Sequence, residues 1–94
     1  MIIKPRIVNL KVPLLNGEES LLTVKKWLVA VGEQVEIDQD LVELDFNDEL
    51  YLLPSPLDGK LISIEAETEE KVEPGQVLAT IEMDDEAIGN RQKY

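Results

Sequence analysis

The 94-residue chain contains no cysteine and no histidine. Without cysteine it has neither a disulfide nor a thiolate nucleophile, and without histidine it lacks the commonest general base and the commonest nitrogen ligand for metals. Aromatic residues are also scarce, with one Trp, one Phe and two Tyr, so the core must be built mainly from Val, Leu and Ile. These absences exclude most familiar catalytic sites, and we expect a chain that is not an enzyme in its own right.

Positive charge is scarce as well. Nine basic residues stand against twenty acidic ones, which gives a formal net charge of −11. Such a chain repels phosphate backbones and anionic membranes. No long apolar run follows the N-terminal residues 1–6, as a secretory signal or a membrane span would require. We therefore expect a cytoplasmic protein that binds neither nucleic acid nor membranes.

The length and the 44% apolar content predict one domain with one modest core. Apolar and polar residues alternate in residues 7–12 and 22–28, as expected for β-strands with one buried face. Further strands are predicted at residues 41–44, 50–53, 60–65 and 77–82. The pattern is typical of a small antiparallel barrel or sandwich spanning residues 1–83, followed by an acidic and polar tail at 84–94 that frays.

The chain also repeats itself at an offset of 37 residues. At this offset apolar positions coincide: Val24 with Leu61, Trp27 with Ile64, Val35 with Val72, Leu41 with Leu78, and Leu44 with Ile81. The acidic segment 45–49 likewise falls on 82–86, so that Asp48 overlies Asp85 and two acidic tips are predicted. Two copies are too few for a solenoid, and they favour two half-folds that share one core about a pseudo-two-fold axis. Chance similarity between two acidic, Val/Leu-rich stretches is the alternative.

A series of short motifs gives the most specific signal. In order they are Val12-Pro13, Gly17-Glu18, Val24-Lys25-Lys26-Trp27, Val31-Gly32-Glu33-Gln34-Val35, Asp40-Leu41-Val42-Glu43-Leu44, Pro54-Ser55-Pro56, Gly59 and Gly75-Gln76-Val77-Leu78. Over roughly residues 7 to 83 the chain thus resembles the lipoyl domains of 2-oxoacid dehydrogenase acyltransferase subunits, which belong to the biotinyl/lipoyl carrier family. The resemblance implies an all-β fold, a flattened antiparallel barrel-sandwich hybrid of two sheets with pseudo-two-fold symmetry.

The resemblance also implies an attachment site, a lysine preceded by aspartate at a hairpin tip. Counted without a gap from both flanking strands, Asn47 falls on the family aspartate and Asp48 on the family lysine. Lipoate and biotin are joined through an amide that needs an amine, which a carboxylate cannot supply. We therefore expect a degenerate site at Asp48, flanked by Asn47 and Glu49, and no cofactor, although the family implies lipoate. Asn and Asp tolerate tight turns, so whether this tip binds a partner or is an ordinary solvated turn stays open.

Four other features are candidates for chemistry. Lys60 follows Asp58-Gly59 and is the nearest substitute lysine, but it lies where the resembled family has no attachment site. The acidic segment 45–49 lacks the glycine and the bidentate glutamate of a calcium loop, so no metal site is predicted. The acidic run 65–73 is either a face for a basic partner or a solvated loop. Trp27 is predicted to fill the core rather than to stack on a ligand.

Three functions compete at this point. The first is a non-catalytic protein-interaction module with an unidentified protein partner, linked to 2-oxoacid dehydrogenases or to the lipoylation machinery. The second is a lipoyl or biotinyl carrier that uses a different lysine or a noncovalent ligand. The third, an enzyme in its own right, is the least compatible with the missing residue types.

Overall fold

The computed structural model describes residues 6–15 and 20–84. Its regular structure consists of eight β-strands: β1 (Ile7–Lys11), β2 (Leu22–Trp27), β3 (Gln34–Val35), β4 (Asp40–Phe46), β5 (Glu49–Pro54), β6 (Gly59–Ile64), β7 (Lys71–Val72) and β8 (Val77–Met83). Over these described ranges, no helix has the length and apolar character to cross a membrane.

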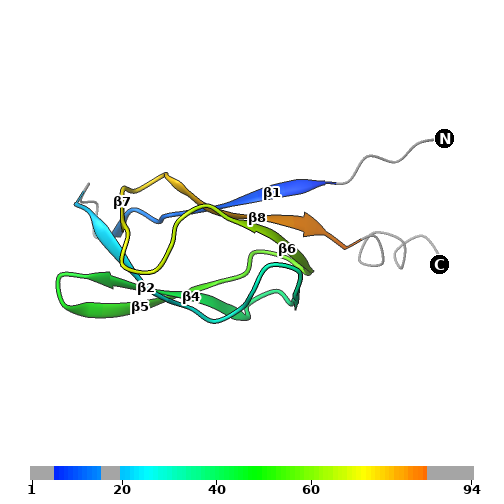
Figure 1. The fold of residues 1–94 in the computed structure, drawn as a ribbon, viewed down its shortest axis with the longest axis horizontal. Coiled ribbons are helices and arrows are strands. Elements are labelled where there is room, and N and C mark those ends of the chain that lie inside the picture. The colour runs from blue at the N-terminus through cyan, green and yellow to red at the C-terminus, as the bar shows by residue number, and fades with distance from the viewer. Residues whose placement is uncertain (1–5, 16–19, 85–94) are drawn as a thin grey trace.

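The strands form two four-stranded sheets, with the orders β1-β8-β6-β3 and β5-β4-β2-β7. Every pairing within them is antiparallel. Figure 1 shows the two sheets as layers of a flattened molecule, with long connections that cross between them. The all-β, two-sheet fold predicted from the motifs is confirmed.

The 37-residue repeat is the symmetry of this fold. Shifted by 37 residues, the bounds of β2, β3 and β4 coincide with those of β6, β7 and β8. The turns repeat too: the backbone N–H of Glu36 donates to Gln39 Oε1 at 2.9 Å, and that of Glu73 donates to Gln76 Oε1 at 3.0 Å. Each half therefore contributes a matching set of strands to each sheet, as the pseudo-two-fold axis requires.

The core lies between the two sheets and is aliphatic, as the composition predicts. Leu41 and Leu44 on β4 are fully buried, and so are their equivalents Leu78 and Ile81 on β8. Burying each such side chain contributes about 1.5–3 kcal/mol relative to leaving it exposed. Trp27 packs against this cluster but is only partly buried. The predicted core role of Trp27 is thus met in part, and one region of its ring stays accessible.

The end of β8 marks the limit of the described chain. After Met83, the Asp84 N–H donates to the Asp58 carbonyl oxygen at 3.1 Å, and Asp84 Oδ1 accepts a hydrogen bond from Gln34 Nε2 at 2.6 Å. The rest of the predicted tail, with Asp85 and the second acidic tip, lies outside the described residues, so the division at residue 83 stays a prediction.

Candidate functional site

The hairpin between β4 and β5 holds the predicted site. Phe46 and Glu49 form its last cross-strand pair, which leaves Asn47 and Asp48 as a two-residue loop. Their φ angles are 52° and 64°, the pattern of a type I′ turn, whose twist matches that of the flanking strands. Asn and Asp are the non-glycine residues that enter this region most readily. The sequence therefore specifies a tight hairpin at this point.

The tip is exposed and lies at one end of the molecule. In Figure 1 it is opposite the end at which β1 begins and β8 stops. Asn47, Asp48 and Glu49 are all exposed, so the structure brings the three predicted site residues together. The Tyr51 hydroxyl donates to Glu49 Oε2 at 3.2 Å. Desolvation first, and then this hydrogen bond and the negative charge of Glu49, raise the pKa of Tyr51.

Two leucines follow the tip on β5, an edge strand that has no partner strand on its outer side among the residues described. Leu50 and Leu52 are 59% and 48% exposed. Their cross-strand partners on β4 are Asp45 and Glu43, so each leucine shares its face of the sheet with a carboxylate. The hairpin thus presents apolar side chains beside negative charge, an arrangement suited to contact with another protein.

The tip residues do not fit an amide-linked cofactor, because none of Asn47, Asp48 and Glu49 carries an amine. Lys60 is exposed, but it lies within β6, where it pairs with Gln34 and Glu82, and not at a hairpin tip. The other lysines of the described chain, also exposed, are Lys11, Lys25, Lys26 and Lys71. That Asp48 occupies the attachment position stays a prediction from the motifs.

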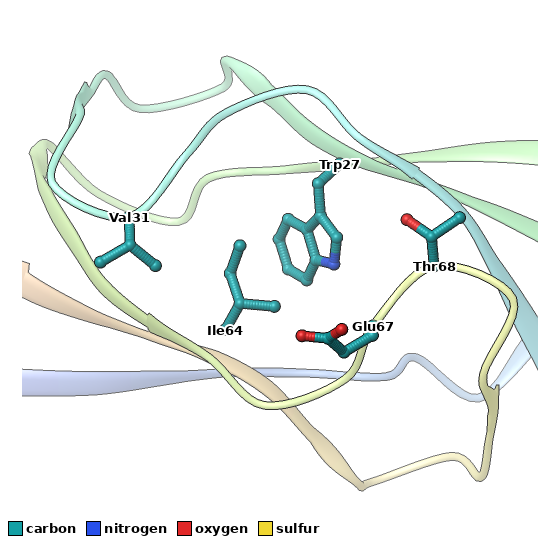
Figure 2. Close-up of a pocket in the computed structure, with 5 residues that line it drawn as sticks. All are labelled: Trp27, Val31, Ile64, Glu67 and Thr68. Carbon is teal, nitrogen blue, oxygen red and sulfur yellow. The ribbon is translucent and has the colours of Figure 1, made fainter.

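A second candidate site is a pocket that the sequence did not predict. Trp27, Val31, Ile64, Glu67 and Thr68 line a shallow pocket beside the loop that joins β6 to β7 (Figure 2). The Trp27 indole N–H donates to the Ala66 carbonyl oxygen at 2.8 Å and so ties that loop to β2. The 37-residue offset could have drawn attention to this place, because it superposes Trp27 on Ile64. As for metals, no group of three or more suitable side chains occurs within the ranges that the structure covers.

The chain is similar to segments of much longer proteins. It is 38% identical over 74 residues to the dihydrolipoyllysine-residue succinyltransferase component of the 2-oxoglutarate dehydrogenase complex of Bartonella vinsonii subsp. berkhoffii, which covers 79% of this chain and 18% of that protein. It is 33% identical over 82 residues to the dihydrolipoyllysine-residue acetyltransferase component of the pyruvate dehydrogenase complex of Corynebacterium glutamicum, covering 87% of this chain and 12% of that one. The chain thus spans less than a fifth of the length of these relatives.

A solved structure supports the fold independently. A single-chain, multi-domain long-chain acyl-CoA carboxylase contains a region that matches 97% of this chain with a TM-score of 0.71. The sequence identity is 15%, and the match covers 8% of the carboxylase. At that identity the likeness concerns the architecture alone, and it agrees with the two-sheet barrel-sandwich described above.

The expectation of no cofactor is wrong. The sequence model of a family described as biotin-requiring enzyme matches residues 9–81, and the relatives are named for a dihydrolipoyllysine residue. These findings point to a family whose members carry covalently bound lipoate or biotin. The expectation rested on the missing amine at Asp48 alone, and the lack of an amine at one position does not exclude a cofactor from the whole domain. Because the match covers well over half of its length, the chain belongs to the biotin/lipoyl family, with lipoyl domains of 2-oxoacid dehydrogenase acyltransferases among its relatives.

Proposed function

We propose that this chain acts as a non-catalytic protein-interaction module associated with a 2-oxoacid dehydrogenase complex or with the lipoylation machinery. The observation that carries the proposal is the β4–β5 hairpin, whose exposed tip presents Asp48 and Glu49 where the motifs place an attachment lysine. The relatives are components of such multienzyme complexes, which supports protein partners of this kind.

The hairpin surface indicates what a partner must offer. In a complex, Leu50 and Leu52 would bury their exposed apolar surface against the partner. Each Å² removed from water in this way contributes roughly 25 cal/mol to binding. Asp45, Asp48 and Glu49 add negative charge around them, and the net charge of −11 extends that field over the molecule. A partner with basic residues around an apolar patch is attracted and oriented by this field, whereas an acidic partner is repelled.

Native co-purification tests the proposal. The tagged chain is expressed in the cell from which it comes, purified without denaturant, and its partners are identified by mass spectrometry. Asp48→Asn with Glu49→Gln removes two charges from the tip at nearly constant size. Glu36→Gln with Glu73→Gln removes two charges from turns elsewhere and is the matched control.

We expect components of a 2-oxoacid dehydrogenase complex, or enzymes of lipoylation, to be enriched with the unmodified chain and with the control but not with the tip variant. Equal recovery with both variants would show that the hairpin is not the contact surface. Failure to enrich any such component would contradict the proposal itself.

The family membership favours a second candidate, a carrier that uses a different lysine or a noncovalent ligand. Lys60 is the substitute lysine that the sequence suggests, since Asp58 and Gly59 precede it at the start of β6. Incubation with a lipoate ligase, lipoate and ATP, followed by peptide mapping, tests the covalent form. Lipoylation of Lys60 or of another lysine would show that the chain is a carrier and would contradict the interaction-module proposal.

A further inference from the structure

The pocket beside Trp27 has a volume of about 370 Å³. Its walls come from the end of β2 and the segment after it, which contribute Trp27 and Val31, and from the end of β6 and the loop after it, which contribute Ile64, Glu67 and Thr68 (Figure 2). These segments are far apart in the sequence, and the fold brings them to one place.

The pseudo-two-fold axis explains this location. Trp27 and Ile64 are equivalent positions at the 37-residue offset, and so are Val31 and Thr68. The pocket is therefore formed by matching segments of the two halves around the axis. Its fifth residue, Glu67, is equivalent to Ala30, so the symmetry is broken by one carboxylate. The repeat provides the shape, and sequence differences between the halves provide an indole and a single negative charge.

The hydrogen bonds determine which groups remain for a ligand. The Trp27 indole N–H donates to the buried Ala66 carbonyl oxygen. This hydrogen bond fixes the orientation of the ring and leaves the face of the ring available for a ligand. The Glu67 backbone N–H donates to Glu70 Oε1 at 3.1 Å, which holds the turn. The Glu67 side chain is exposed, and in Figure 2 its carboxylate points into the pocket below the indole, toward Ile64. Its carboxylate accepts no hydrogen bond from the residues described.

An aromatic face, two aliphatic side chains and one carboxylate together match a cation on an alkyl stem. The stem of such a group would lie along Val31 and Ile64, and its charged head would be attracted both by Glu67 and by the π-face of Trp27. An anionic ligand would be repelled by Glu67 and by the net charge of −11. A neutral apolar ligand would desolvate Glu67 without compensation.

We propose that this pocket binds a basic side chain, lysine or arginine, of a protein partner. The inference deepens the proposed interaction role and rests on it for the nature of the partner, but the pocket is a site separate from the hairpin tip. The partner's basic side chain would then be held between the two halves of the repeat.

The single tryptophan makes a direct test possible, because the indole N–H gives one signal in a nitrogen–proton correlation spectrum. The ¹⁵N-labelled chain is titrated with Nα-acetyl-lysine amide. Nα-acetyl-norleucine amide, which has the alkyl stem without the ammonium, is titrated in parallel. We expect saturable shifts of the Trp27 indole N–H and of the Val31 and Thr68 amides with the lysine compound, and at least twofold weaker binding of the norleucine compound.

Glu67→Gln keeps the size of the side chain and removes its charge. We expect it to weaken binding of the lysine compound about two- to fivefold, as an ion pair at a partly exposed site does, whereas Glu73→Gln leaves the affinity unchanged. Equal affinity for both compounds, no effect of Glu67→Gln, or no saturable shift would each overturn the proposal. The probe is a small molecule, and its binding requires no dehydrogenase component. Its failure to bind would therefore not contradict the proposed function, which the co-purification tests separately. The tip variant, Asp48→Asn with Glu49→Gln, is expected to bind the lysine compound as the unmodified chain does.

Discussion

At the scale of single residues, the hairpin tip is determined by backbone conformation as much as by chemistry. Asn47 and Asp48 both have positive φ, a region that costs most residue types free energy. The sequence predicts a tight turn here because Asn and Asp tolerate this region, and the structure bears that out. These two residues therefore favour the shape of the hairpin, whatever they bind.

The substitution Asp48→Val tests whether the positive φ at this position determines the stability of the hairpin. A β-branched residue at a φ of 64° is expected to lower the free energy of unfolding by about 1–2 kcal/mol. Chemical denaturation followed by Trp27 fluorescence measures it. Leu50→Val, at an exposed position in the adjoining strand, is the control and is expected to change stability little. An equally small effect of both substitutions would contradict the turn geometry.

Gly59 is required for the close approach of β6 and β8. A Cβ atom at this position would overlap the carbonyl oxygen of Glu82 and crowd the side chain of Ile81. Because the backbone of β8 would have to shift, Gly59→Ala is expected to destabilise the fold by roughly 1–3 kcal/mol in thermal or denaturant unfolding. Lys60→Ala, at the exposed neighbouring position, should cost much less. Comparable unfolding free energies for the two variants would refute the steric argument.

The raised pKa of Tyr51 gives a prediction about pH. A folded-state value above the unfolded one means that this group's contribution to stability is complete below the ordinary tyrosine pKa of about 10 and is lost as the pH rises through the folded-state value. In a Tyr94→Phe background, which leaves one tyrosine, ultraviolet absorbance follows the phenolate of Tyr51. Glu49→Gln is expected to lower the midpoint, since it removes the negative charge beside the hydroxyl. An unchanged midpoint would rule out coupling between the two side chains.

Among the elements, alternation in the first two strands, and apolar runs between turn residues in the others, located the long strands to within one or two residues. It did not reveal β3 and β7, because two residues are too few to show a period. These short strands exist because β6 and β2 provide partners for them, a long-range effect that local sequence does not encode. The pocket was missed for a related reason: it depends on loops meeting across the axis, which leaves Trp27 half-buried rather than enclosed.

The loop between β6 and β7 depends on Trp27. Trp27→Phe keeps an aromatic ring but leaves the buried Ala66 carbonyl oxygen without its donor, so a loss of about 1–3 kcal/mol is expected. Hydrogen exchange of the amides in residues 65–70 should quicken in this variant. Tyr51→Phe also removes a hydroxyl–carboxylate contact, but an exposed one, and its effect should be smaller. Unchanged hydrogen exchange of the loop amides would show that the Trp27–Ala66 hydrogen bond does not hold the loop in place.

For the whole molecule, the net charge of −11 destabilises the folded state through self-repulsion, but it strengthens the attraction to a basic partner. Raising the ionic strength from about 0.01 M to 0.15 M shortens the Debye length from about 30 Å to 8 Å. Self-repulsion is then screened, so the melting temperature is expected to rise. Attraction to a basic partner is screened as well, so affinity for it should fall. A melting temperature that decreases with salt would show that attractive charge pairs outweigh the repulsion.

We propose that the fold keeps the family's attachment hairpin while Asp48 occupies the lysine position. The most direct measurement is lipoylation of the double variant Asn47→Asp, Asp48→Lys by a lipoate ligase, with the modified residue located by peptide mapping. We expect modification at position 48 of this variant, because the two-residue turn between β4 and β5 already presents that side chain to solvent. A folded double variant that remains unmodified at position 48 would contradict the proposal.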